Sequence, residues 1–545
     1  MRLPLLALFI CGNLFLVNAQ SNQWLVSPPT TLNDDYFVYF KTNETTGSPS
    51  LSVKALQRRQ KNCIQVDEKD WRVSNRFLKK VTSLGANVQM HSRWLNGAYI
   101  SCSQAVAKEI SSLPSVKKII PQKRIVSQTC GGKVPCFNFS LPQTDLLDAR
   151  QLHQNGFTGE GVLICVMDDG FDNLQNVSAF TKLFNEKRIL ARKNFLTNDS
   201  DVFWVGGHGT AVLSNICGFV EGQIVGTGIG ASFLLARTEI DSVETPLEMY
   251  LWVAAAEWAD SIGADIFSTS LGYSQFDDPQ YDYYYADMDG GTTPISKAAQ
   301  IAADKGILVV NSAGNSGNEN WRYITAPADA TGVLTVGAVG GNRELATFSS
   351  RGPTWDGRIK PDICALGASN LTMGPGGYLY YTNGTSFSCP LISGLAACLM
   401  QAAPWATAAE LFETLKRSGD HANKPDNDYG YGTPSGSKTY QLLTGKTLPA
   451  VPDCGNLNPD GFGLFPNPSN GLFNLAINSP NGSRGYTYLV HDMSGRILLN
   501  VGTSSFSGIR QWTIDIRDIA TGIYYLQVQD SDGYTVFEHK VAVVE

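Results

Sequence analysis

The 545-residue chain lacks several features that mark other classes of protein. It has no dense basic run, and 49 acidic residues outnumber 42 basic ones for a net charge of −7, which argues against a nucleic-acid partner. No C-x-x-C pair occurs, which argues against a zinc site. Charged residues make up only 17 % of the chain, a value typical of a globular protein rather than a disordered one.

Long hydrophobic runs are also scarce. The run at residues 3–16 follows Arg2 and leads to Ala19, the pattern of a secretory signal peptide (1–19) cleaved after that alanine. A transmembrane anchor is the alternative, but the run is short and Asn13 interrupts it. No later stretch of the sequence is long and apolar enough to span a membrane. The sequence therefore predicts an exported protein without a transmembrane segment.

The chain has 11 cysteines, one of them in the predicted leader. Export permits disulfides, and Cys130 and Cys136 in C-G-G-K-V-P-C are the nearest candidates for a pair. Cys165, Cys389 and Cys398 lie in apolar segments, so we expect buried thiols or core pairs there rather than metal ligands.

Residues 20–127 carry no catalytic signature. Their pattern follows the order β-α-β-β-α-β, the split βαβ arrangement of ferredoxin-like folds. The expected elements are strands at 36–40, at 88–102 with a break at Asn96-Gly97 and at 116–126, and helices at 73–84 and 105–113. A small α+β module behind a signal peptide is expected to be a pro-segment, with an ordinary accessory domain as the alternative.

Residues 128–443 form the largest predicted domain. Apolar strands alternate with helices, which predicts an α/β fold with a parallel sheet covered on both faces. Three expected strands lead to candidate site residues: 162–167 to Asp168, 266–270 to Gly272, and 307–310 to Asn315. Sites in open parallel sheets form at the carboxyl ends of strands, so we expect these residues at one edge.

The C-terminal part has a different pattern. Residues 444–462 are rich in proline and predict a linker. Short strand-like runs follow within 463–545, and the turn pairs Asn481-Gly482, Ser494-Gly495 and Asp532-Gly533 separate several of them. This pattern predicts a small antiparallel β-sandwich.

One serine stands where an apolar helix is expected to begin. Ser386 follows Gly384-Thr385 and precedes the apolar run 391–403, a place where a hydroxyl usually caps the helix. A nucleophilic serine needs an imidazole to accept its proton and a carboxylate to orient that imidazole. Of the six histidines, only His208 lies at a glycine-rich junction leading into a helix. Asp168 ends a buried strand, so a triad is available.

The motifs around these residues resemble those of the subtilisin-like serine peptidases over about 300 residues, the length of one large domain. The aspartate, histidine and serine motifs also occur in the chain order of subtilisin. The matching segments are Val166-Met167-Asp168-Asp169-Gly170, Gly207-His208-Gly209-Thr210, Ser312-Ala313-Gly314-Asn315 and Gly384-Thr385-Ser386-Phe387-Ser388-Cys389-Pro390. The departures, Ala211, Phe387 and Ser388, remove no reactive group.

This resemblance implies a subtilisin-like fold and a role for each residue. Ser386 would attack the scissile carbonyl, His208 would accept and later donate the proton, and Asp168 would fix the imidazole tautomer. Asp169 is the competing carboxylate, and the motif alignment selects Asp168. Asn315 and the backbone N–H of Ser386 would hold the oxyanion.

The resemblance also implies a polypeptide substrate, bound as an extended strand. The walls of its specificity pocket would be two short segments, Ser270-Leu271-Gly272 and Ser312-Ala313-Gly314, which leave room for sizeable apolar side chains. No cofactor is required. Calcium is common in the family, but the acidic, tyrosine-rich stretch at 277–289 has no fixed ligand spacing, and such carboxylates more often belong to a solvated loop. Its aspartates are Asp277, Asp278, Asp282, Asp287 and Asp289.

The regions on either side of the expected peptidase domain resemble domains that accompany peptidases of this kind. Residues 20–127 resemble the inhibitory pro-segment of subtilases by pattern and position. Residues 463–545 resemble the sorting domain of the type IX secretion pathway at Phe465–Gly471, Met493–Arg496 and Leu526–Val528. That implies secretion, or display at the cell surface, through the outer membrane of a Gram-negative bacterium. The alternative for residues 463–545 is a carbohydrate- or protein-binding β-sandwich. The alternative for the whole chain is a catalytically inactive scaffold.

Overall fold

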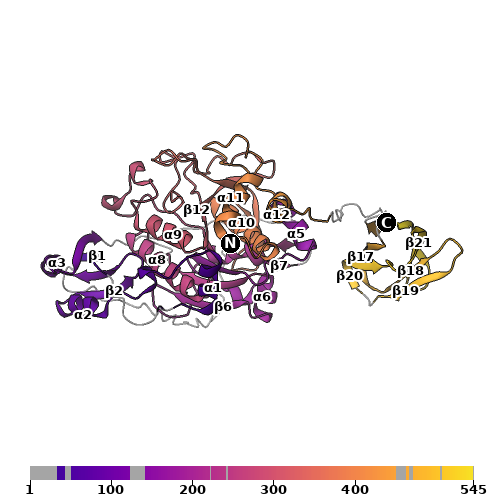
Figure 1. Ribbon diagram of the computed structural model, residues 1–545, viewed down its shortest axis with the longest axis horizontal. Coiled ribbons are helices and arrows are strands. Elements are labelled where there is room, and N and C mark those ends of the chain that lie inside the picture. The colour runs from indigo at the N-terminus through magenta and orange to yellow at the C-terminus, as the bar shows by residue number, and fades with distance from the viewer. Residues whose placement is uncertain are drawn as a thin grey trace, which may run out of the picture.

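The computed structural model describes residues 34–42, 49, 51–122, 141–220, 223–240, 243–449, 462–465, 471–503 and 506–543. The predicted signal peptide and the predicted pair of Cys130 and Cys136 lie outside the described residues. Figure 1 shows a small α+β module packed against a large α/β domain, with a β-sandwich at the C-terminal end.

A seven-stranded sheet with the order β13-β12-β11-β10-β5-β9-β6 forms the centre of the large domain, and each pair of neighbouring strands is parallel. The strands are β5 (Leu163–Asp168), β6 (Ile189–Asn194), β9 (Ser232–Arg237), β10 (Ile266–Thr269), β11 (Leu308–Ser312), β12 (Val333–Val339) and β13 (Ile363–Leu366). Every residue of β5 is buried, as a central parallel strand requires.

Helices cover both faces of this sheet, which confirms the predicted α/β class. Successive side chains of a strand point to opposite faces, and in β5 Ile164 belongs to one core cluster and Cys165 to the other. The first face carries α7 (His208–Cys217) and α10 (Thr385–Ala402), and the second carries α8 (Pro246–Ile262) and α9 (Pro294–Asp304).

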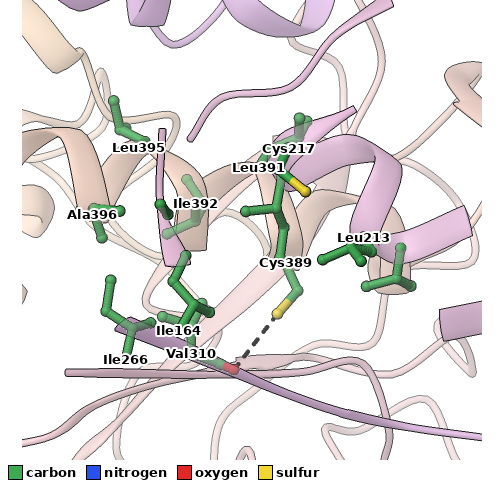
Figure 2. Packing of buried hydrophobic residues seen from close by; sticks show 14 of the residues in the cluster. Ile164, Leu213, Cys217, Ile266, Val310, Cys389, Leu391, Ile392, Leu395 and Ala396 are labelled. Atoms are coloured by element: carbon green, nitrogen blue, oxygen red, sulfur yellow. Dashed lines mark hydrogen bonds between the residues drawn. The ribbon is translucent and has the colours of Figure 1, made fainter. Parts of the chain in front are cut away.

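Helix α10 is the central helix of the first face. Figure 2 shows its Ile392 above Ile164 and Ile266 of the sheet and its Leu391 beside Cys217 of α7. The Cys389 thiol donates to the Val310 carbonyl at 3.5 Å. The prediction that no later stretch is long and apolar enough to span a membrane is wrong by length and composition: among the described helices α10 alone meets both measures, but 78 % of it is buried inside the protein. Its apolar character therefore belongs to the core.

The remaining elements of the large domain surround the sheet. They are α4 (Leu141–Asp145), α5 (Ala149–Gln154), η2 (Leu174–Asn176), η3 (Ser178–Phe180), α6 (Thr181–Asn185), β7 (Phe219–Val220), β8 (Ile224–Val225), η4 (Pro279–Tyr281), η5 (Tyr285–Asp287), β14 (Asn370–Met373), β15 (Leu379–Thr382), α11 (Ala408–Ser418) and α12 (Gly436–Thr444). The cysteines predicted as buried thiols or core pairs are free and buried: Cys165, Cys389 and Cys398.

The N-terminal module has the predicted β-α-β-β-α-β order with one addition. Its antiparallel sheet has the order β2-β3-β1-β4. The elements are β1 (Asp34–Phe40), α1 (Val53–Lys61), η1 (Glu68–Asp70), α2 (Asn75–Ser83), β2 (Asn87–Ser92), β3 (Gly97–Cys102), α3 (Gln104–Ser111) and β4 (Val116–Gln122). Helix α1 was not predicted, because its buried residues are Ala55 and two arginines, Arg58 and Arg59, so it has no apolar stripe.

The C-terminal module is the predicted antiparallel sandwich. Two sheets, β16-β17-β20 and β19-β18-β21-β22, enclose one apolar cluster. The strands are β16 (Phe462–Phe465), β17 (Leu472–Arg484), β18 (Tyr486–His491), β19 (Ile497–Gly502), β20 (Phe506–Asp515), β21 (Gly522–Asp530) and β22 (Thr535–Val543). One expected turn is wrong: β17 continues through Asn481-Gly482, and a shift in register between Ser479 and Arg484 accommodates the pair.

Candidate active site

Three neighbouring strands of the large sheet end at candidate site residues. Asp168 is the last residue of β5, Ser270 follows the last residue of β10, and Asn315 comes shortly after β11. Since these strands are adjacent and parallel, their carboxyl ends lie at one edge. The structure therefore brings these three residues to the same edge of the sheet, as expected.

His208 is the first residue of α7 and faces the end of β5. Its Nδ1 lies 2.7 Å from Asp168 Oδ1, while the imidazole stays 36 % exposed and the Asp168 side chain only 3 %. Asp168 Oδ1 also accepts the backbone N–H of Asp169 at 3.0 Å. Its Oδ2 is buried with no hydrogen-bond partner in the described part of the chain. A buried carboxylate thus orients an accessible imidazole.

The neighbouring carboxylate, Asp169, contacts the backbone instead of the ring. Its Oδ1 accepts the N–H of Gly209 at 3.0 Å and its Oδ2 accepts the N–H of His208 at 3.3 Å. The first N–H groups of a helix have no partner within it, and the N-cap residue Gly207 has no side chain to supply one. Asp169 therefore caps α7 from another loop, and the two adjacent carboxylates have different partners.

The charges around the imidazole alter its pKa. Burial alone would lower the pKa of His208, but the adjacent Asp168 and, more weakly, Asp169 and Glu239 outweigh it and raise that pKa. Burial, followed by repulsion from Asp168, raises the pKa of Asp169. The cluster of these groups favours the imidazolium form.

Gly170 follows the two aspartates and allows the loop to approach α7 closely. Its φ is +144°, and a Cβ there would lie 2.0 Å from the Val205 carbonyl oxygen. A side chain would displace the loop that carries both carboxylates.

Ser386 is the second residue of α10, and its hydroxyl is held by a neighbouring strand end. Ser386 Oγ donates to the Ser270 carbonyl at 3.4 Å, and Ser270 Oγ donates to the Ser386 carbonyl at 2.9 Å. That carbonyl is available because Pro390, four residues on, has no N–H to offer it. The proline of the serine motif thus has a local physical role.

The serine motif also lies against the imidazole. The ring of Phe387, the next residue, lies 5.7 Å from the His208 ring between centroids. Ser386 and His208 share no hydrogen bond in the structure, and catalytic hydrogen bonds are often long or poorly aligned in the free enzyme.

Asn315 lies beside the start of α10. Its Oδ1 accepts both the backbone N–H and the hydroxyl of Thr385, at 2.9 and 3.0 Å. These two bonds orient the side-chain amide, whose N–H groups have no hydrogen-bond partner in the described part of the chain. The backbone N–H of Ser386 has no partner in the described part of the chain. Two donors therefore remain free near the Ser386 hydroxyl.

The two predicted pocket walls follow the adjacent strands β10 and β11. Ser312 Oγ and the Asn311 amide both donate to the Leu271 carbonyl, at 3.4 and 2.9 Å, which ties the walls together. The backbones of Gly272 and Gly314 lie near one further side chain. Added Cβ atoms at these two positions would lie 2.0 and 3.2 Å from the hydroxyl oxygen of Thr325.

Thr325 is a pocket residue that sequence reasoning missed. It is 6 % exposed, and its Oγ1 is buried with no hydrogen-bond partner in the described part of the chain. The two glycines signal that something lies close to both walls, but no local pattern identifies a threonine in a distant loop. Thr325 thus lies against the glycines of both predicted pocket walls.

The acidic loop suggested for calcium uses its carboxylates locally. Asp282 accepts the N–H of Phe276 at 2.7 Å, and Asp289 accepts those of Gly291 and Thr292 at 2.8 and 2.7 Å. In the described chain, one group of at least three His, Cys, Asp or Glu side chains brings its ligand atoms within 4.8 Å of one another, and it is Asp168, Asp169 and His208. The loop aspartates do not form such a group.

Three parts of the chain match models of known protein families. A model of the subtilase family matches residues 159–432, half of the chain. The chain belongs to the subtilase family. A peptidase S8 propeptide domain of the Bacteroidota matches residues 35–132 of this subtilase, and a secretion system C-terminal sorting domain matches residues 463–543. The protein is therefore a subtilisin-like serine protease, made with a propeptide and secreted or displayed through the outer membrane by the type IX pathway.

Curated relatives of this subtilase include several subtilisins. Subtilisin E of Bacillus subtilis is 26 % identical over 356 residues, covering 65 % of this chain and 82 % of the relative. Serine protease AprX of the same species is 29 % identical over 321 residues, covering 53 % and 69 %. A thermostable alkaline protease of Halalkalibacterium halodurans is 24 % identical over 326 residues, covering 60 % and 78 %.

Proposed function

We propose that the protein is a secreted serine endopeptidase that hydrolyses peptide bonds through an acyl-enzyme, with Ser386, His208 and Asp168 as its triad. The observation that carries the proposal is the 2.7 Å contact between His208 Nδ1 and the buried Asp168 carboxylate, beside the start of α10. Fold alone does not define an activity, but this arrangement of base and orienting carboxylate is that of acyl transfer.

The nucleophile becomes active by a short side-chain rotation. Turning Ser386 about χ1 moves its hydroxyl from the Ser270 carbonyl toward the imidazole Nε2. His208 then accepts the proton as Ser386 Oγ bonds to the scissile carbonyl carbon, and returns it to the leaving amine. Asp168 holds the hydrogen on Nδ1, so that Nε2 is the basic atom. A water molecule, deprotonated by His208, then attacks the acyl-enzyme, and the bond to Ser386 Oγ breaks to release the carboxylic acid product.

The oxyanion would be held by the two free donors. The Ser386 N–H lies at the N-terminus of α10, where the helix dipole favours negative charge. The Asn315 amide is already aimed by its bonds from Thr385, so stabilising the oxyanion costs little reorganisation.

The substrate would be an extended polypeptide whose side chain enters between the two tied walls. The walls are backbone and small side chains, which suits a sizeable apolar group. The unpartnered Thr325 hydroxyl, beside the glycines of both walls, would limit the depth of this pocket and offer one polar contact. We therefore propose a preference for medium-sized over the largest aromatic side chains.

The proposed domains are a signal peptide (1–19), an inhibitory pro-segment (20–127), the peptidase (128–443), a linker (444–462) and the sorting domain (463–545). The family matches at 35–132, 159–432 and 463–543 support this division. Sequencing both termini of the secreted protein tests it. The expected form begins near residue 128 and ends within the linker.

Labelling with a fluorophosphonate tests the activity itself. The wild-type secreted protein should take the label and Ser386→Ala should not. Ser388→Ala is the matched control, because Ser388 is a buried serine two residues away whose hydroxyl donates to the Thr385 carbonyl within α10. Label on the Ser386→Ala variant would contradict the assignment. An unlabelled wild-type protein would favour the inactive scaffold.

A further inference from the structure

Helix α1 of the N-terminal module lies across the C-terminal ends of α8 and α9 of the large domain. The glycines just past these two helices, Gly263 and Gly306, provide its seat. A Cβ on Gly263 would lie 2.8 Å from the Lys54 side chain, and one on Gly306 would lie 2.6 Å from that of Asn62. At Gly263 the added atom would also lie 2.9 Å from the backbone nitrogen of Ala55, so a side chain there would displace α1 itself.

Helix α1 also donates hydrogen bonds to backbone carbonyls at the C-terminal ends of α8 and α9. The last turn of a helix leaves C=O groups without partners and carries a partial negative charge. The Ser52 hydroxyl, at the start of α1, donates to the Ile262 carbonyl at 2.6 Å. The Arg58 guanidinium donates to the carbonyls of Ala264 and Lys305. Polar groups of α1 thus cap both helices.

One buried aspartate at the end of α8 holds three arginines of the N-terminal module. The Asp260 side chain is 0 % exposed. Arg59 donates to its two oxygens at 3.0 and 2.9 Å, Arg93 donates at 3.2 Å, and Arg58 donates to it as well. Both oxygens of the carboxylate at the end of α8 are therefore paired with arginines of the N-terminal module.

A second buried ion pair has the charges reversed, with the acid on the N-terminal module and the base on the large domain. Asp70 of the N-terminal module, also 0 % exposed, accepts from Lys305 of the large domain at 2.9 Å and from Arg59. Burial would raise the pKa of Asp70, but the bonds from Arg59 and Lys305 outweigh it and lower that pKa. Each module thus contributes both an anion and a cation to the same buried cluster.

This cluster lies far from the catalytic groups. Helix α1 contacts Gly161 and Asp265, which precede β5 and β10, and Gly306, which precedes β11. These are the amino ends of the strands whose carboxyl ends carry the catalytic residues. A six-residue strand such as β5 spans about 20 Å. Helix α1 therefore cannot act by contact with the triad.

The cluster is also separate from the contact made by the module's sheet. That sheet packs Phe37 against Tyr250, in the first half of α8, with stacked rings 4.4 Å apart. Between this aromatic contact and the end of α8, the end of β2 and the turn after it bind Glu257, which accepts the Ser92 hydroxyl at 2.6 Å and the Trp94 N–H at 3.0 Å. The N-terminal module is thus attached along α8 at three places, and α1 contributes only to the last, at the helix end.

We propose that α1 is a clasp that holds the pro-segment on the peptidase after the chain between them is cut, with Arg58 and Arg59 on Asp260 as its fastening. This inference rests on the proposed inhibitory role of the pro-segment. Removing α1 leaves the Asp260 charge to be rehydrated together with several helix-end carbonyls. The clasp therefore opens slowly, and its opening sets the time at which activity appears.

Two lysines replacing the arginines test the clasp in the full chain. Arg58→Lys/Arg59→Lys keeps both charges but loses the planar fork that reaches two oxygens and two carbonyls at once. After self-cleavage, we expect the delay before a peptide substrate is hydrolysed to shorten by roughly tenfold or more. Gel electrophoresis times the cleavage, and a chromogenic peptide times the activity.

The matched control is Lys79→Met/Lys80→Met, which changes two adjacent exposed cations on α2 of the same module. Its delay should equal that of the wild type. A double-lysine variant with the control's delay would overturn the clasp. A wild-type protein that neither cleaves itself nor hydrolyses the peptide would instead contradict the proposed function.

Hydrogen exchange gives a readout that needs no activity. In the full-length Ser386→Ala protein, the Arg58→Lys/Arg59→Lys change should accelerate exchange of the α1 amides by roughly tenfold, with the amides of β1 and β3 unchanged. Unchanged α1 amides, or equal loss of protection in α1 and the sheet, would overturn the proposal of a separate clasp.

Discussion

The two edges of the large parallel sheet differ in how completely their buried carboxylates are paired. At the carboxyl edge, Asp168 Oδ2 has no hydrogen-bond partner in the described chain and the His208 imidazole is 36 % exposed. At the amino edge, the Asp260 side chain is fully buried and receives three arginines. The carboxylate at the first edge keeps an unpaired oxygen, whereas both oxygens of the carboxylate at the second edge accept hydrogen bonds from the N-terminal module. In that second cluster, Arg59 Nε and Arg93 Nε are buried without a hydrogen-bond partner in the described chain.

This difference has a physical reason. An unpaired buried polar atom costs free energy, so it persists only where the surrounding packing holds it in place. The carboxyl edge is held by bonds between backbone segments, such as those joining Ser270 and Ser386. The amino edge lies away from the catalytic groups, and there the pairing of both Asp260 oxygens attaches the N-terminal module to the large domain.

Removing the Asn315 amide should produce the largest effect of the variants at the carboxyl edge. Asn315→Ala should lower kcat by roughly 10²–10³-fold with little change in KM, a magnitude measured for the corresponding asparagine of subtilisin itself. Asn318→Ala, an exposed asparagine in the same loop, is the control and should behave as wild type. Equal loss of kcat in both variants would mean that the loop, rather than the amide, matters.

Removing the charge of Asp169 should change the pH dependence by a smaller amount. The nearby carboxylates raise the pKa of His208, so activity should rise with pH as the imidazolium loses its proton. Asp169→Asn keeps an acceptor for the helix N–H groups but removes negative charge, so the pKa of His208 falls and the acidic limb of kcat/KM moves to lower pH. Asp172→Asn should leave the limb in place. A lower kcat with an unmoved limb would show a purely structural role for Asp169.

Breaking an exposed ion pair at the amino edge should have the smallest effect. Lys54 of α1 lies 2.6 Å from Asp265, with side chains 37 % and 23 % exposed. Such pairs contribute about 0–1 kcal/mol, so Lys54→Met should lower the thermal midpoint of full-length Ser386→Ala protein by no more than a few degrees. A drop as large as that of the Arg58→Lys/Arg59→Lys variant would remove the distinction between buried and exposed contacts of α1.

The strands and most helices followed from local patterns. The apolar run 162–167 can be buried on both faces only as a central parallel strand, so the position of Asp168 at its end was predictable. The small helix α1 was not, because its buried face is made of arginines that become buried only against Asp260. The turn expected at Asn481-Gly482 failed since pairing with β20 extends across it.

The sequence by itself determined the domain order, the α/β sheet and the motif residues, because hydrophobic period and motif spacing are local properties. Tertiary structure decided which of the two adjacent carboxylates binds the imidazole. The start of α7 offers two kinds of partner, the His208 ring and free backbone N–H groups; Asp168 binds the ring and Asp169 binds the N–H groups. It also placed Thr325 beside two distant glycines and closed α1 on the far edge of the sheet. These are contacts between segments far apart in the chain, and only packing brings their charges and hydroxyls within bonding distance.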